Sequence, residues 1–92
     1  MGTVIKLPTL YNRSVDMKIE DFERLGEAEQ RVLIFGAEKL TERNTASENI
    51  QLFKIDNFFV EVMTSLKQKL KRHIHTYSFK NLPVEYSRVI LQ

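Results

Sequence analysis

Aromatic and β-branched residues dominate residues 51–63, which form the clearest pattern in this chain. An Asp56-Asn57 pair interrupts this run, and both residue types tolerate the positive φ angles of a type I′ turn. The pattern therefore predicts two antiparallel strands joined by a two-residue turn. This register gives the hairpin one almost entirely apolar side, on which the paired residues are Ile55 with Phe58, Phe53 with Val60, and Gln51 with Val62.

The opposite side of the hairpin is mixed. The same register places Leu52 opposite Glu61 and Phe59 opposite Lys54 there, and it pairs Met63 with another apolar residue, Ile50. An antiparallel sheet with one buried face shows this asymmetry. Four apolar neighbours on a second face nevertheless require a cover, which either a helix of the same chain or another protomer can provide.

Two short helices are predicted before the hairpin. Asp16 is a suitable N-cap for a helix that ends near Arg24. Gly26, with Glu29 at the third helical position, begins a second helix over residues 27–35. Gly36 then ends this helix in the left-handed region. The expected buried face of the second helix contains Ala28, Val32 and Phe35, widened by Leu33 and Ile34.

Residues 37–43 contain good helix formers, so propensity alone would continue the second helix through them. Gly36 interrupts that pattern, and Leu40 is the single strongly apolar residue beyond it. We therefore favour an edge strand over 38–43, followed by a loop over 44–48 that is rich in turn-forming residues.

A further strand is predicted over residues 69–79. The expected register pairs it with the second hairpin strand, so that Leu70 faces Val62, Lys71 faces Glu61, Arg72 faces Val60, His73 faces Phe59 and Ile74 faces Phe58. Arg72 on the core side is the weak point of this register, and a bulge or an edge position would relieve it.

Pro83 follows Asn81-Leu82, a sequence typical of a helix start. The short C-terminal helix that it predicts has an apolar face of Leu82, Tyr86, Val89 and Ile90.

The elements together predict one α+β domain over residues 1–92, in which residues 1–15 form an extended arm or a short edge strand. Short N-terminal helices, an antiparallel meander of three or four strands and a short C-terminal helix make up this fold. The helices are expected to cover the face that carries Phe53, Ile55, Phe58, Val60 and Val62.

Composition supports a globular domain, with 42% hydrophobic and 28% charged residues. The apolar runs fall far short of the ~18 residues of a membrane span, and no secretory signal is visible, so we expect a cytoplasmic protein that contacts no membrane. The chain has no cysteine, which excludes disulfides and thiolate metal sites.

The net charge of +2 is unevenly distributed along the chain. Residues 1–62 contain 8 Lys or Arg against 11 Asp or Glu, whereas residues 63–92 contain 6 against 1. The C-terminal third is therefore strongly basic, which suits an anionic partner but equally suits an acidic helix that folds back on a basic strand.

The strand Phe58-Phe59-Val60-Glu61-Val62, together with Glu29-Gln30 in a short helix and the glycine at 36, resembles a group of small bacterial proteins of unassigned function. The resemblance covers roughly residues 22–79. It implies a compact cytoplasmic α+β protein with a strand after Gly36, and it implies no activity.

Candidate chemistry in the sequence is sparse. His73 and His75 lie on the same face of the predicted strand, and Glu61 lies diagonally across from them, a combination that could ligate a metal ion. Lys69 and Lys71 share that face and oppose a cation, so we predict solvated histidines and no metal site. The sequence contains no nucleophile triad, phosphate-binding glycine loop or zinc-binding helix motif. We therefore predict a non-enzymatic protein without a cofactor or a small-molecule ligand.

The preferred interpretation is a small protein-interaction domain that self-associates, or binds another protein, through the outer face of the sheet. The interface candidates are Leu52, Phe59, Glu61 and Met63. The alternative is a nucleic-acid-binding protein that uses the basic strand over 67–79, in which Lys69, Lys71 and Arg72 contact phosphates.

Overall fold

The computed structural model describes residues 16–69 and 71–91. The predicted arm over 1–15 lies outside the described residues, as does Leu70. The fold is α+β, as predicted from the sequence: short helices, a four-stranded antiparallel meander in the order β1-β2-β3-β4, and a short helix at the C-terminal end. The strands are β1 (Glu38–Asn44), β2 (Glu48–Ile55), β3 (Phe58–Ser65) and β4 (Arg72–Ser78).

The β2–β3 hairpin has the predicted register. Ile55 lies opposite Phe58, and the pairing continues residue by residue to Glu48 opposite Ser65. Of the two turn residues, Asp56 alone has a positive φ, of 49°, so the prediction of a type I′ turn, with both in that region, is wrong.

The same two turn residues also hold the chain that leads into the first helix. The Asp56 carboxylate accepts a hydrogen bond from the Met17 N–H at 2.6 Å, and the Asn57 amide donates to the Asp16 carboxylate at 2.7 Å. Asp16 is therefore not the N-cap that the sequence suggests. The helix α2 (Ile19–Arg24) begins after Lys18, whose N–H donates to the Asp21 carboxylate.

The helix α3 (Glu27–Phe35) has the predicted bounds. Gly26 is its N-cap, and the Gly26 N–H donates to Glu29 at 3.0 Å. Two details differ from the prediction. Gly36 lies at φ −91°, outside the left-handed region. The buried side chains are Leu33 and Ile34, because one face of a helix cannot bury four consecutive apolar residues; Ala28, Val32 and Phe35 are exposed.

Residues 38–44 form the edge strand that we favoured over a continued helix. β1 carries one extra residue relative to β2, so that Lys39 pairs with Phe53 but Thr41 pairs with Leu52. This bulge directs Leu40 toward the outer face of the sheet. The predicted loop over 44–48 is shorter in the structure, since β2 already begins at Glu48.

The predicted register of β4 is wrong by four residues. Val62 lies opposite Ile74 rather than Leu70, Phe59 opposite Tyr77 rather than His73, and Glu61 opposite His75 rather than Lys71. A shift by an even number keeps every side chain on its predicted face, so the apolar pattern alone could not exclude it. The shift also moves Arg72 away from the core to the exposed start of the strand, opposite Thr64.

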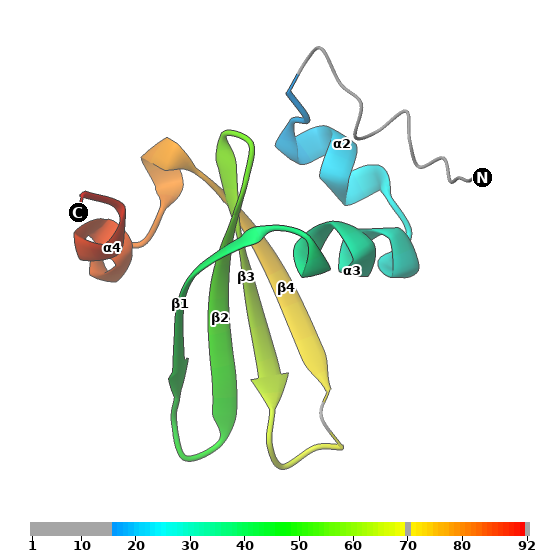
Figure 1. Ribbon diagram of the computed structural model, residues 1–92. Coiled ribbons are helices and arrows are strands. Elements are labelled where there is room, and N and C mark those ends of the chain that lie inside the picture. Colours follow the sequence, from blue (N-terminus) through cyan, green and yellow to red (C-terminus); the bar gives the residue numbers. More distant parts are fainter. Residues whose placement is uncertain (1–15, 70, 92) are drawn as a thin grey trace.

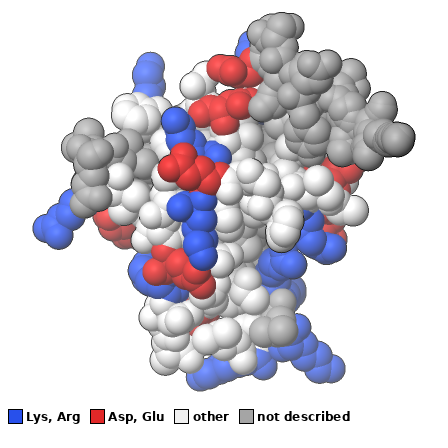
Figure 2. All heavy atoms as spheres, viewed as in Figure 1, with Lys and Arg blue, Asp and Glu red and all other residues white. Residues whose placement is uncertain are grey.

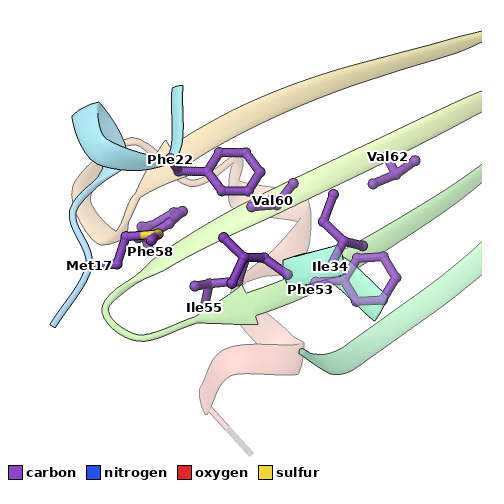
Figure 3. Packing of buried hydrophobic residues seen from close by; sticks show 9 residues of the cluster. Met17, Phe22, Ile34, Phe53, Ile55, Phe58, Val60 and Val62 are labelled. Atoms are coloured by element: carbon purple, nitrogen blue, oxygen red, sulfur yellow. The ribbon is translucent and has the colours of Figure 1, made fainter. Parts of the chain in front are cut away.

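The main core lies between the sheet and the helices α2 and α3, as predicted (Figure 1). Phe22 of α2 is fully buried and packs against Phe58, with ring centroids 5.8 Å apart. At the other end of this core, Ile34 of α3 lies beside Phe53 (Figure 3). Burial of these side chains is the principal force that holds the helices on the sheet.

Replacing Phe22 by alanine removes this ring from the core. We expect the free energy of unfolding to fall by about 3–5 kcal/mol, since the transfer term and the residual cavity both destabilise. Urea denaturation followed by circular dichroism measures the loss. Phe35→Ala is the matched control: Phe35 is 92% exposed, so its loss should change stability by no more than about 0.5 kcal/mol. Equal effects of the two substitutions would contradict the packing described here.

Candidate functional site

The outer face of the sheet is covered by the chain's own C-terminal segment (residues 79–91), which contains the 3₁₀ helices η2 (Phe79–Asn81) and η3 (Val84–Tyr86) and the helix α4 (Ser87–Leu91). This segment and the helices α2 and α3 lie on opposite sides of the sheet (Figure 1). A second apolar cluster therefore forms outside the main core. It consists of Leu52, Phe59 and Tyr86, with Leu40, Tyr77 and Leu82 packed around them.

The predicted interface residues lie in or beside this cluster. Leu52 is 0% exposed and Phe59 is 2% exposed, Glu61 is buried between them and the segment, and Met63 is half-buried. The sequence allowed either a helix of the same chain or another protomer to cover this face, and in the structure a segment of the same chain covers it. These residues therefore do not form an open surface, and their contact with a partner stays a prediction that requires the C-terminal segment to move.

Glu61 is the buried charged residue at the centre of the outer face, with 6% of its surface exposed. Its two carboxylate oxygens accept hydrogen bonds from two tyrosine hydroxyls: Oε2 from Tyr86 of η3, and Oε1 from Tyr77 of β4 at 3.3 Å. A buried carboxylate without such donors is strongly destabilising. Glu61 therefore requires Tyr86 in place, and the C-terminal segment is held where Tyr86 can reach it.

Both hydroxyls are held in the protonated, donating state. Burial, reinforced by the hydrogen bond to Glu61, raises the pKa of Tyr86 above its ordinary value, and burial together with the nearby Glu61 charge raises that of Tyr77. His75, directly opposite Glu61 on β4, stacks on Tyr77 with ring centroids 6.4 Å apart. The His75 ring therefore covers part of Tyr77 on its solvent-facing side.

The remaining contacts of the C-terminal segment are modest. The Glu85 carboxylate lies 3.5 Å from the Arg43 guanidinium of β1, and both side chains are at least half exposed, so this ion pair contributes little. A hollow of about 440 Å³ lies between Val89 of α4 and the strands, bordered also by Phe59 and Phe79. Among the described side chains of the segment, Tyr86 makes the buried polar contact with the sheet.

Glu61 borders none of the three hollows described in this section, and both of its carboxylate oxygens already accept hydrogen bonds from tyrosine hydroxyls. The arrangement of one carboxylate and two phenols suits docking of a polypeptide segment, because it makes an otherwise apolar contact directional. Its chemistry is that of a positioned hydrogen-bond acceptor.

A second hollow, of about 780 Å³, lies on the opposite face of the sheet, between α3 and the strands; we call it the α3 groove. Its apolar wall includes Val32 and Phe35, which are 51% and 92% exposed, and Phe53 lies on its sheet side. A smaller hollow of about 450 Å³ lies at the other end of α3, beside Gly36 and Asp56. The α3 groove was not predicted from the sequence. The run of four apolar residues Val32–Phe35 nevertheless contained a signal for an exposed apolar surface, because one buried face of a helix cannot accommodate all four side chains.

Three cations border the α3 groove, and none of its lining residues is acidic. Lys39 is held by Glu42 at 2.5 Å, and this contact, with help from Asn49, lowers the pKa of Glu42 to about 2. Arg31 pairs with Glu27 at 3.1 Å on the exposed side of α3. Arg72 is exposed and forms no ion pair within residues 16–69 and 71–91. It is the cation most available to an anionic partner.

The basic residues that the sequence singled out lie at one end of the sheet. Lys69 and Lys71 belong to the β3–β4 loop rather than to a strand, and Lys69 has a φ of 55°. Arg72 begins β4. Figure 2 shows Lys and Arg side chains gathered at this lower end of the molecule, below the acidic patches at the helical end.

The histidines of the disfavoured metal site do not converge on a ligand set. His73 lies opposite Met63, while His75 lies opposite Glu61, whose oxygens face the two tyrosines. Within the described part of the chain, no three His, Asp or Glu side chains are grouped so that they could hold a metal ion.

Comparisons of the chain with protein-family models, curated proteins and solved structures found no match. The resemblance based on the Phe58–Val62 strand therefore stays a prediction. Among the helices of residues 16–69 and 71–91, none has the length and apolar character needed to cross a membrane.

Tyr86→Phe tests whether the hydroxyl anchors the segment. The substitution keeps the ring but removes one of the two donors to buried Glu61, so the free energy of unfolding should fall by about 1–3 kcal/mol. Tyr77→Phe is the matched control and should cost less, because Tyr77 is half-buried and its hydrogen bond is longer. Urea denaturation of the two variants measures the difference, and a greater loss in Tyr77→Phe would contradict the anchoring role of Tyr86.

Alkaline pH should weaken the same contact. The folded-state pKa of Tyr86 lies above the ordinary value of 10.0, so its contribution to stability is complete below pH 10.0 and decreases as the pH rises beyond it. Urea midpoints measured between about pH 8 and about pH 11 should therefore fall in the wild type, and fall less in Tyr86→Phe. An equal decline in both proteins would show that other groups cause the alkaline loss.

Proposed function

We propose that this chain is a small non-enzymatic protein-interaction domain and that its binding surface is the α3 groove. The observation that carries the proposal is the combination of Val32 and Phe35, exposed on α3, with the adjoining hollow of about 780 Å³. An apolar pocket with a few convergent polar groups is the default binding-site hypothesis for a domain of this kind. The Phe35 ring is almost fully exposed to water, which lowers the solubility of the protein unless a partner covers the ring.

The charges around the groove favour an acidic, amphipathic segment of another protein as the partner. Apolar side chains of such a segment fit against Phe35 and Phe53, while its carboxylates approach Arg72. The carboxylates of the partner can also pair with Arg31, because the ion pair between Arg31 and Glu27 is solvent-exposed and easily exchanged. Charge complementarity of this kind selects the partner and accelerates association.

A synthetic peptide tests this function. We expect a fluorescein-labelled peptide of about 12 residues, composed of leucine and glutamate on opposite helix faces, to bind and to shift the NMR signals of Val32, Phe35 and Phe53. Phe35→Ser and Arg72→Glu should each weaken binding about tenfold, the effect of a residue at an interface hot spot. Val84→Ser, which alters an 84% exposed apolar residue of η3 outside the groove, is the control and should leave the affinity unchanged.

The nucleic-acid alternative predicts a different result. Single-stranded RNA would then bind at low salt, lose affinity steeply as salt rises, and depend on Lys69, Lys71 and Arg72 but not on Phe35. Peptide binding that ignores Phe35→Ser, together with this RNA behaviour, would replace the proposed function by the alternative.

A further inference from the structure

The cover of the outer face is a terminal part of the chain rather than a core element. The described contacts of the C-terminal segment with the sheet include Tyr86 and Leu82 in the outer cluster and Phe79 against Phe59. The described backbone hydrogen bonds of the segment are local, as in the Tyr86 N–H donation to the Pro83 carbonyl at 2.9 Å. Its one α-helix has five residues, Ser87–Leu91. A segment with local backbone bonds and a hollow of about 440 Å³ beneath it belongs to the least stable part of a fold.

We propose that two copies of this chain exchange their C-terminal segments, so that Tyr86 of one copy donates its hydroxyl to Glu61 of the other. The occupant of the outer face is then the same segment, supplied by a second copy. Because the two copies are identical, each contact of the closed form, including Leu82 against the Leu52–Phe59 cluster, is available in the exchanged form. The apolar residues Leu52 and Phe59 stay covered in both.

The connection to β4 suits such an exchange. Leu82 and Pro83 are extended, with ψ of 132° and 141°, and they separate η2 from η3. The five residues 79–83 between β4 and η3 would span up to about 17 Å when fully extended. Unwinding the single turn of η2 is therefore enough to redirect the segment, and it leaves the pairing of β4 with β3 unchanged.

Glu61 gives the exchange its specificity. A purely apolar face accepts many apolar segments, whereas a buried carboxylate accepts only a segment that places a hydrogen-bond donor over it. Tyr86 provides that donor, and the exposed Glu85–Arg43 pair at 3.5 Å marks where the arriving segment lies beside β1. This interaction uses the opposite face of the sheet from the α3 groove, so neither proposal depends on the other.

The absence of cysteine from the sequence makes a direct test possible. Arg43→Cys and Glu85→Cys are prepared as separate full-length variants, each with one thiol at an exposed position of the ion pair. In a mixture of the two, exchange brings a thiol of one chain against a thiol of the other. Because cysteine is shorter than arginine or glutamate, a bis-maleimide cross-linker is used to bridge the two thiols. We expect it to yield the mixed cross-linked dimer at least about tenfold faster than in a control mixture of Glu85→Cys with Lys67→Cys, as the high effective concentration within a complex requires.

A second variant removes any dependence on the cross-linking rate. The chain that carries both Arg43→Cys and Glu85→Cys, cross-linked within itself by the bis-maleimide reagent at low protein concentration, holds its own segment in place. Light scattering at high protein concentration should show a dimer for the wild type and a monomer for this closed variant. Equal cross-linking in the two mixtures, or a monomeric wild type at high concentration, would overturn the exchange, and neither result bears on peptide binding in the α3 groove.

Discussion

The register of the β2–β3 hairpin is the constraint on which the rest of this structure depends. Shifting β3 by one residue relative to β2 would turn Glu61 toward the core between the sheet and the helices, and none of the described residues of that core is a tyrosine. It would also turn Val60 and Val62 outward. Asp56 and Asn57 set this register at the turn and, through Met17 and Asp16, also fix the chain that leads into α2. One local feature thus determines both which face is apolar and where the covering helices begin.

Both faces of the sheet then need a cover, and a short chain provides two unequal ones. On one side, α2 and α3 bury a continuous aromatic and aliphatic core around Phe22 and Phe58. On the other side, the described contacts of a 3₁₀ turn and a five-residue helix are the Tyr86–Glu61 hydrogen bond, a small apolar cluster and one exposed ion pair. The inequality has a physical origin: the helices interact through a large apolar area, while the C-terminal segment satisfies one buried charge and shields a few side chains.

The sequence predicted the local parts of this arrangement well. The turn residues and the aromatic and β-branched residues beside them predicted the hairpin register, and Gly26 with Glu29 predicted the start of α3. Gly36 with a single apolar Leu40 correctly separated β1 from the helix before it. It failed where the decision rests on distant partners. The register of β4 is fixed by loop length and by Ile74 opposite Val62, and an even shift leaves the apolar pattern unchanged. Likewise Glu61 and Tyr86 are 25 residues apart, so no local pattern could indicate their contact.

The error at β4 also changes the meaning of Glu61. With Lys71 opposite it, Glu61 would form an ordinary cross-strand ion pair on an exposed face, and the outer surface would need no particular cover. With His75 opposite it and Tyr77 beside it, the carboxylate is buried and its remaining oxygen must accept from outside the sheet. That requirement selects Tyr86 and, through it, the position of the whole C-terminal segment. The polar residue on the outer face is therefore what makes its cover specific, whichever copy of the chain supplies it.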